Sequence, residues 1–434
     1  MTPRGLSWLC IARLGLVQAA IGAIVMLATS LLNRVMMVEY ALPAALPAGL
    51  VAWHYAVQLS RPLWGHESDS GRRRTPWIIG GMGVLAAGAM LAAESLRVIV
   101  AHGWVGYGLA ILAFSLIGAG VGAAGTSLLA LLAAQVAPAR RAAAASLTWI
   151  MMIAGIIVSS AVAGHWIDPF SLARLEGVVA GVAGMAFLLS TVAVLGVERG
   201  DAARVAAGPP APPFAVALAE IWADPEHRRF TMFVFLSMLA YSMQDLILEP
   251  FSGLRFAMTP GQSTQMSSVQ HSGVLLGMVL VGVGGSAFGG RDAATLARWI
   301  VGGCIGSALA LTGLVLAARY GPGWPIVGTI FLLGFANGVF AVAAIGRMMA
   351  LAGDGGSSRA GLRMGVWGAA QAIAFGLGGL TGAVAVDAAE ALTGSVPESF
   401  MLVFGAEALL FLLAAALSLR APPRVAHLGG EVVI

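Results

Sequence analysis

The chain has 434 residues, of which 59% are hydrophobic and 10% are charged, and its mean hydropathy is +0.89. A soluble enzyme has roughly a quarter of its residues charged, so this composition excludes that class. All 24 basic residues are arginines spread along the chain and the formal charge is only +4, so nucleic acid is not an expected partner. The two cysteines, Cys10 and Cys304, both lie in apolar stretches, which provide neither a disulfide framework nor a metal site.

The apolar residues form stretches long enough to cross a membrane. A bilayer core about 30 Å thick needs roughly 20 apolar residues for each crossing helix. Short polar breaks divide the chain into twelve such stretches, which predict helices near residues 13–38, 45–64, 77–95, 104–134, 146–166, 175–197, 230–252, 269–289, 298–318, 325–350, 364–386 and 399–419. The first stretch has no convincing small-residue cleavage site, so we interpret it as a membrane helix and not as a signal peptide.

The arginines predict how these helices are oriented. Basic residues gather in the loops on the cytoplasmic side of a membrane. With twelve helices, 19 arginines fall on the side of both termini, and only Arg34, Arg97, Arg174, Arg255 and Arg319 fall on the other side. We therefore expect both termini in the cytoplasm, with the protein in the bacterial inner membrane.

Several features recur at about half the chain length, which indicates an internal repeat. Trp149 and Trp367 are 218 residues apart, Asp168 and Asp387 are 219 apart, and further pairs are Glu39 with Glu249, Phe114 with Phe331, and Gly122 with Gly338. The longest polar stretch, 198–229, lies between the copies and contains five prolines, four of them within 209–213. We predict an N-terminal six-helix half (1–197), a cytoplasmic linker (198–229), a C-terminal six-helix half (230–420) and a cytoplasmic tail (421–434).

Two parallel six-helix halves are the arrangement of major facilitator transporters, so we expect an all-α membrane protein with that fold. The loop 65–74 resembles the superfamily's loop of the form G-x-x-x-D-x-x-G-R-R/K. Asp69 would there pair with arginines such as Arg72 and Arg73 as a cytoplasmic latch between the halves. The alternative is a plain positive loop without a latch function. The corresponding loop of the second half retains only Arg291 and Asp292.

Polar residues inside membrane helices are energetically costly and mark candidate functional sites. They cluster in the first, second, seventh and eighth predicted helices. The candidate pigment or substrate residues are Asn33, Arg34, Glu39, His54, Gln58, Gln244, Asp245, Glu249, His271 and Gln371. Further polar residues in the helices are Gln18, Gln270, Asn337, Arg347 and Glu407.

Two of these groups have alternative interpretations. Asp245 and Glu249 are four residues apart and share a helix face, so with Glu39 they are candidate proton-coupling acids. Alternatively they lie at the water interface, where Pro250 ends the helix and Arg34 or Arg255 pairs with them. His54 is either a hydrogen-bonded core histidine or a neutral imidazole that donates a lone pair to a metal.

Several local strings are more specific than the architecture. The stretches 32–39, 54–66, 244–251, 273–278 and 363–371 resemble the PucC/LhaA family, the bacteriochlorophyll delivery branch of the facilitator superfamily, and the likeness runs from about Arg13 to Arg420. The string from His54 to Leu59 is most similar to the branch named after a bacteriochlorophyll synthase chain. This resemblance implies a membrane protein that binds bacteriochlorophyll or a late precursor as cargo, and that either passes it to light-harvesting apoproteins or accepts it from chlorophyll synthase.

The resemblance also implies roles for particular residues. The magnesium of the pigment would take an axial ligand such as His54, His271 or Gln58, and Asn33, Gln244 or tryptophans would donate to ring carbonyls. Because the eight aspartates never lie within fifteen residues of one another, a paired-aspartate synthase site is not expected, and we predict a protein that is not an enzyme. The alternatives are a proton-coupled small-molecule transporter and a chaperone for apoprotein helices that holds no pigment.

Overall fold

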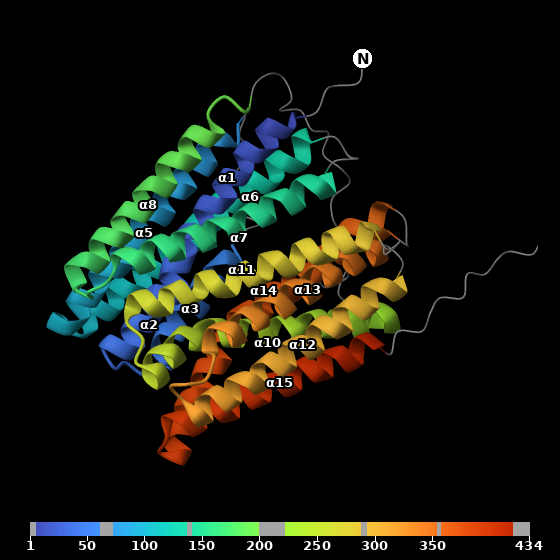
Figure 1. Ribbon diagram of the computed structural model, residues 1–434. Helices are drawn as coiled ribbons and strands as arrows, with labels where there is room; N and C mark the ends of the chain where they lie inside the picture. Colours follow the sequence, from blue (N-terminus) through green and yellow to red (C-terminus); the bar gives the residue numbers. More distant parts are fainter. Residues whose placement is uncertain are drawn as a thin grey trace, which may run out of the picture.

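The regular secondary structure of the described residues is helical throughout. The computed structural model describes residues 6–60, 73–136, 141–198, 222–287, 293–353 and 357–419. Within these ranges the chain forms twelve long helical segments, in agreement with the predicted all-α fold. The two parallel halves lie side by side in the view of Figure 1, the first in blue to green and the second in yellow-green to red.

The first half contains six helical segments, and the first of them is interrupted. It consists of α1 (Trp8–Met26), a π-helical turn η1 (Leu27–Leu31), α2 (Leu32–Arg34) and a second π-helical turn η2 (Val35–Glu39). The other five are α3 (Ala45–Gln58), α5 (Thr75–His102), α6 (Trp104–Gln135), α7 (Arg141–Trp166) and α8 (Leu172–Val194).

The second half also contains six helices. They are α10 (Pro225–Phe256), α11 (Pro260–Ala287), α12 (Ala293–Tyr320), α13 (Ile326–Gly353), α14 (Ser357–Thr393) and α15 (Val396–Leu419). The first and last described helices begin at Trp8 and end at Leu419 at the same end of the bundle, which we term the termini end. The opposite end, where Glu39, Trp166, Phe256 and Thr393 close their helices, is the far end.

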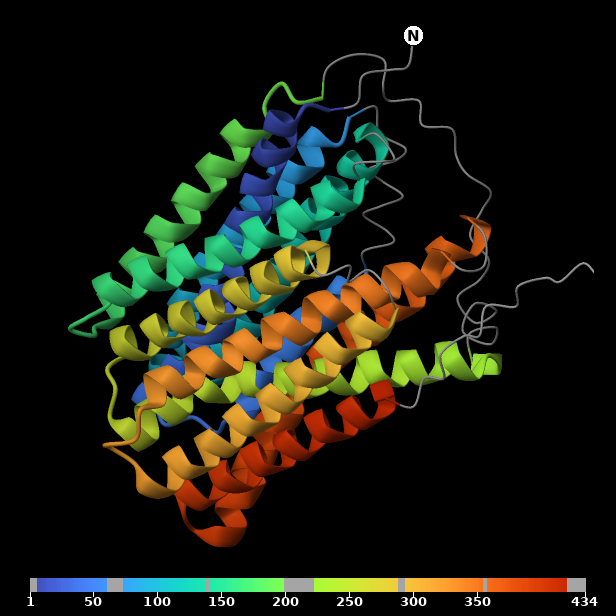
Figure 2. The same ribbon diagram turned by 45° about the vertical axis from the view of Figure 1, so that its right-hand side comes forward.

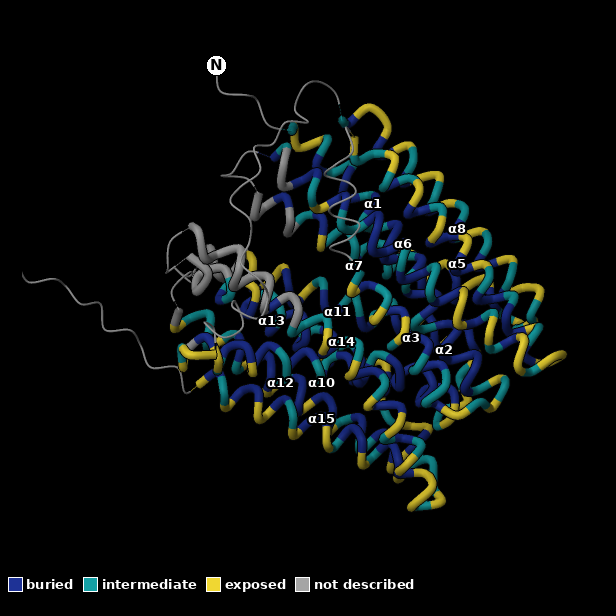
Figure 3. The backbone as a smooth tube through the Cα atoms, turned by 180° about the vertical axis from the view of Figure 1, so that it is seen from behind, coloured by how far each residue is buried: buried dark blue, intermediate teal, exposed yellow. Residues whose placement is uncertain are grey.

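Ten of these helical segments are long and apolar enough to cross a membrane. The remaining two are α3, which has 14 residues, and α11, whose first half carries many polar side chains such as Gln262, Ser267 and His271. Large apolar side chains such as Leu188 and Leu309 are exposed on the outside of the bundle, where lipid would cover them. Figure 3 shows the buried segments gathered toward the middle of the bundle. The protein is a multi-pass membrane protein.

Two helix pairs carry most of the packing between the halves. They are α7 with α11, and α3 with α14, and the segments η1 to η2 add contacts with α10. The view in Figure 2 again shows α11, in yellow, beside α7, in teal green. Because α3 and α11 are the second helices of their halves, and α7 and α14 the fifth, the interface follows the internal repeat.

Close glycine contacts confirm that the repeat is structural. In the first half, a side chain at Gly118 of α6 would collide with the carbonyl oxygen of His54 in α3. In the second half, a side chain at Gly334 of α13 would collide with the carbonyl oxygen of Gln270 in α11. Gly334 lies 216 positions after Gly118, and Gln270 lies 216 positions after His54. His54 is therefore equivalent to Gln270, and Tyr55 is equivalent to His271.

The same contacts predict which glycines are required for packing. A Cβ atom at Gly155 of α7 would overlap the carbonyl oxygen of Ala19 in α1, whereas one at Gly184 of α8 would meet nothing within 4 Å. We expect Gly155→Ala to destabilise the protein by about 1–3 kcal/mol through overpacking. Gly184→Ala should be neutral or should stabilise by roughly 0.5–1 kcal/mol through helix propensity. Thermal unfolding of the two purified variants checks this, and equal midpoints would contradict the packing.

Candidate functional site

The interrupted first helix carries two of the predicted site residues into the interface between the halves. A π-helical turn inserts extra backbone into a helix and frequently marks a functional segment. The Asn33 amide between the two turns donates to the carbonyl oxygen of Leu246 in α10, at 2.6 Å. Arg34 beside it is only 1% exposed. Both side chains thus reach from the first half to the second.

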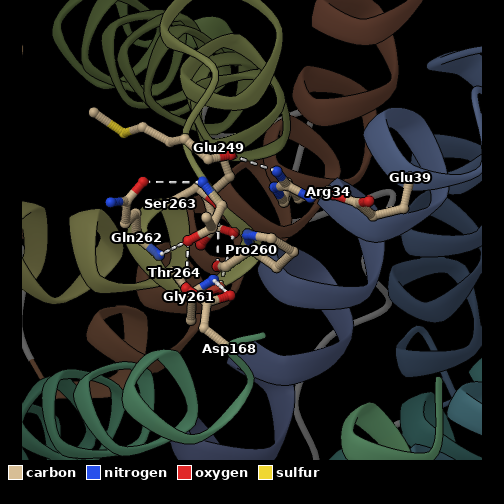
Figure 4. A network of polar contacts seen from close by, with 11 residues as sticks. Arg34, Glu39, Asp168, Glu249, Pro260, Gly261, Gln262, Ser263 and Thr264 are labelled. Atoms are coloured by element: carbon tan, nitrogen blue, oxygen red, sulfur yellow. Dashed lines mark hydrogen bonds and ion pairs between the residues drawn. The ribbon is translucent and has the colours of Figure 1, made fainter. Parts of the chain in front are cut away.

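Arg34 is a buried cation that forms an ion pair with a partly exposed acid and a hydrogen bond across the interface. Its Nη1 donates to Glu39 Oε1 at 2.5 Å, and its Nη2 donates to the carbonyl oxygen of Met258 at 2.7 Å. Figure 4 shows the guanidinium between Glu39 and the start of α11. Glu39 is therefore the ion-pair partner of Arg34, while its own side chain keeps 30% of its surface exposed.

Glu249 lies in the interior and not at a water interface, since it is only 3% exposed. It accepts hydrogen bonds from the hydroxyls of Ser267 and, at 3.5 Å, Thr264. The charge of Arg34 is close enough to act on it, whereas Arg255 instead donates to carbonyl oxygens at the end of α12. Sequence reasoning missed the serine and threonine partners, because hydroxyl residues are frequent in this helix and only their spacing with respect to α10 selects these two.

Asp245 and Gln244 point in different directions. Asp245 keeps some accessible surface although it lies deep in the fold. Gln244 is fully buried on the face of α10 that also carries Phe251, which packs on Phe400 and Phe404 of α15. Neither end of its amide has a hydrogen-bond partner in the described structure. Gln244 therefore faces α15 within its own half, away from the interface.

The two candidate histidines differ in the ring nitrogen that makes a hydrogen bond. The Gln58 amide donates to His54 Nε2 at 2.8 Å, and both side chains are buried in the first half. In His271 of α11, Nδ1 donates to the carbonyl oxygen of Ser267 at 2.8 Å. This bond fixes the neutral tautomer, in which Nε2 carries a lone pair and has no hydrogen-bond partner among the described residues. His271 can therefore act as an axial ligand to a metal. Nε2 of His54 could do so only after its hydrogen bond with the Gln58 amide is broken.

An aromatic group lies between α3, α10 and α14. Phe375 of α14 contacts Tyr55 of α3 and Tyr241 of α10, with ring centroids 6.1 and 5.8 Å apart. All three rings are partly accessible. Gln371, one turn before Phe375, is also partly accessible, and its amide makes only a 3.7 Å contact to the sulfur of Met238. The interface thus combines aromatic surface with a few polar groups, as a binding site for a large apolar ligand requires.

The structure describes the predicted latch only in part. Asp69 and Arg72 of the predicted latch lie outside the described residues, and Arg73 is exposed. In the parts of the chain that the structure describes, no three His, Cys, Asp or Glu side chains come together as metal ligands would. The central group of candidates is accordingly Arg34, Glu39, Glu249, Asp245 and His271.

The burial of Arg34 predicts a large cost of removing it. Arg34→Met would leave Glu39 without its ion-pair partner and the Met258 carbonyl without a donor. It would also leave the buried Glu249 without a nearby cation, and we expect a cost of about 3–5 kcal/mol. Arg97 provides a matched control, because it pairs with Glu176 at 2.5 Å but is 53% exposed. Arg97→Met should cost less than about 1 kcal/mol. Chemical unfolding of both variants in detergent measures the difference, and equal losses would contradict the role of burial.

Comparison with known proteins shows which family the chain resembles. The chain matches the family described as PUCC protein over residues 31–422. It is 52% identical over 410 residues to the bacteriochlorophyll synthase 44.5 kDa chain of Rhodobacter capsulatus, covering 94% of each chain. It is 29% identical to the protein PucC of the same species, over 93% of this chain and 90% of that one, and 29% identical to PucC of Rhodovulum sulfidophilum, over 87% and 84%.

Solved structures confirm the fold. A crystal structure of the nucleoside transporter NupG, in a mutant form, superposes with a TM-score of 0.68 at 13% identity and covers 94% of this chain and 99% of that chain. The peptide transporter POT in complex with sulfate gives a TM-score of 0.67 at 14% identity and covers 93% of both chains. At this identity the likeness concerns the fold alone, which is that of major facilitator transporters. Together with the match to the family over most of its length, this shows that the chain belongs to the PucC protein family.

Proposed function

We propose that this protein binds a bacteriochlorophyll-type pigment, or a late precursor of one, and delivers it within the membrane to light-harvesting apoproteins, beside chlorophyll synthase. Membership of the PucC family and the name of the relative that is 52% identical support the pigment context. A pigment with an isoprenoid tail cannot travel through water, so its carrier has to present an apolar cavity within the bilayer.

The observation that carries the proposal is the state of His271. A magnesium ion at the centre of a bacteriochlorin usually takes one axial ligand, and a neutral imidazole nitrogen is suited to this role. His271 has its Nδ1 proton engaged by Ser267 and its Nε2 lone pair open, on a helix that forms the interface between the halves. Tyr55, the equivalent residue of the first half, belongs to the aromatic group beside Phe375. The flat macrocycle would pack against these rings.

In this proposal the protein handles pigment without catalysing its synthesis. The name of the relative describes a synthase chain, yet the acids at the interface here are engaged in holding the protein together: Glu39 binds Arg34, and Glu249 binds Ser267. From the distribution of the arginines we further propose that the termini end faces the cytoplasm.

Substitution of the histidines tests the pigment site. Protein purified in detergent from a pigment-producing cell should carry at least tenfold less pigment when His271 is replaced by leucine. His54→Leu should keep most of the pigment, because that ring is engaged with Gln58. His165→Leu, at an exposed position near the end of α7, is the control for histidine loss. Absorption spectra normalised to protein measure the ratio, and unchanged pigment in the His271 variant would refute the ligand role.

A proton-coupled transporter is the second candidate, because Glu249 is a buried acid linked to both halves through Ser267 and Ser30. In that case Glu249→Gln would abolish uptake driven by a pH gradient in proteoliposomes, and pigment binding would be absent from the unsubstituted protein. A chaperone that holds no pigment would instead capture apoprotein helices in a pigment-free preparation.

A further inference from the structure

An aspartate of the first half binds the beginning of a helix in the second half. Asp168 follows α7, and its carboxylate accepts the N–H of Gly261 at 3.1 Å and the hydroxyl of Thr259. Gly261 stands in the first turn of α11, where backbone N–H groups have no partner within the helix. Figure 4 shows the carboxylate beneath this turn. The backbones meet here as well, since a side chain at Gly164 would lie 2.7 Å from the carbonyl oxygen of Gly261.

An aspartate of the second half binds a helix of the first half in the same way. Asp387 of α14 accepts the N–H groups of Ala44 and Ala45, at 3.0 and 2.8 Å. These two residues begin α3, which has no side chain of its own to cap its N-terminus. The carboxylate of the other half therefore supplies the cap and complements the positive end of the helix.

The two contacts are copies related by the internal repeat. Asp168 and Asp387 are 219 positions apart, and Ala45 and Gly261 are 216 apart. The equivalent of Ala44 is Pro260, which has no N–H to donate. The hydroxyl of Thr259 takes the place of that missing donor. Both copies thus retain two hydrogen bonds to one carboxylate, although the residues that donate them have diverged.

We propose that Asp168 and Asp387 are a symmetric pair of clamps that hold the far end of the interface closed, so that their release opens the site between the halves toward that end. Each clamp joins one half to a helix start of the other, and separation of the halves leaves a carboxylate and two donors without partners. The contacts of Asn33 and Arg34 with the second half lie in the last turns of the first helix, toward the same end. The inference rests on the proposed function only in naming pigment as the cargo that the clamps retain.

Distances between spin labels test the clamps in pigment-free protein. After Cys10→Ser and Cys304→Ala, nitroxides are attached at Trp104→Cys and Leu392→Cys, which lie at the far end of different halves and are 89% and 87% exposed. Pulsed EPR on the double variant Asp168→Ala, Asp387→Ala should show a longer and broader distance distribution, with intermediate shifts for the single variants. Glu176→Ala is the control, because it removes a far-end ion pair within the first half, and it should leave the distribution unchanged.

A folded double variant with the parent distribution would overturn the proposal. Gel filtration and helical circular dichroism establish folding. Where the alanine variants do not fold, Asp168→Asn and Asp387→Asn keep one acceptor oxygen and lose the charge. Their distributions should acquire a longer-distance shoulder, and the absence of any change would equally contradict the clamps. Loss of pigment binding in other experiments would leave this result standing, so the two proposals fail independently.

Discussion

The pairing of Arg34 with Glu39 and Met258 shows the constraint under which the interface is built. Within a bilayer a polar group finds no water, so its free energy depends on partners supplied by the protein. Arg34 is 1% exposed, and its guanidinium divides its donors between a carboxylate of its own half and a carbonyl of the other. The interaction that makes the buried cation tolerable therefore also joins the halves. Glu249 meets the same requirement through the hydroxyls of α11.

The internal repeat gives both halves the same helix arrangement, and residues that differ between equivalent positions give the interface its polar groups. Tyr55 and His271 occupy equivalent positions, but only the second offers a lone pair. His54 and His271 are one position off from equivalence, and one position turns a side chain by about 100° around a helix. The first ring thus enters its own half beside Gln58, while the second lies beside Ser267 at the interface. Two similar six-helix units thereby enclose a site that is not symmetric.

The sequence predicts the helices well and the site only in part. Apolar stretches and polar breaks set most helix positions because a bilayer imposes one length on every crossing. The first helix begins earlier than predicted, at Trp8 in place of residue 13, because the Ser7 side chain caps it. The amino-acid composition of this helix does not predict its two π-helical turns. The offset between Asp168 and Asp387 is visible in the sequence, but their role depends on helix ends from the other half that no local pattern reveals.

The direction in which a polar residue points was the least predictable property. Gln244 and Asp245 are neighbours, yet the first faces the aromatic residues of α15 and the second keeps accessible surface within the fold. Periodicity cannot separate them because α10 is apolar on several faces and packs against neighbours on more than one side. The sequence predicted which helices carry polar residues, whereas the division of these residues among interface, core and exposed surface required the structure.

The most direct test of the account is the absorption spectrum of the unsubstituted protein, purified in detergent from a cell that makes bacteriochlorophyll. The account predicts pigment bands that co-elute with the protein in sub-stoichiometric to stoichiometric amount and are shifted from those of free pigment in the same detergent. A pure, folded protein with no pigment bands, prepared under conditions in which a known pigment protein from the same membranes retains its own, would contradict it.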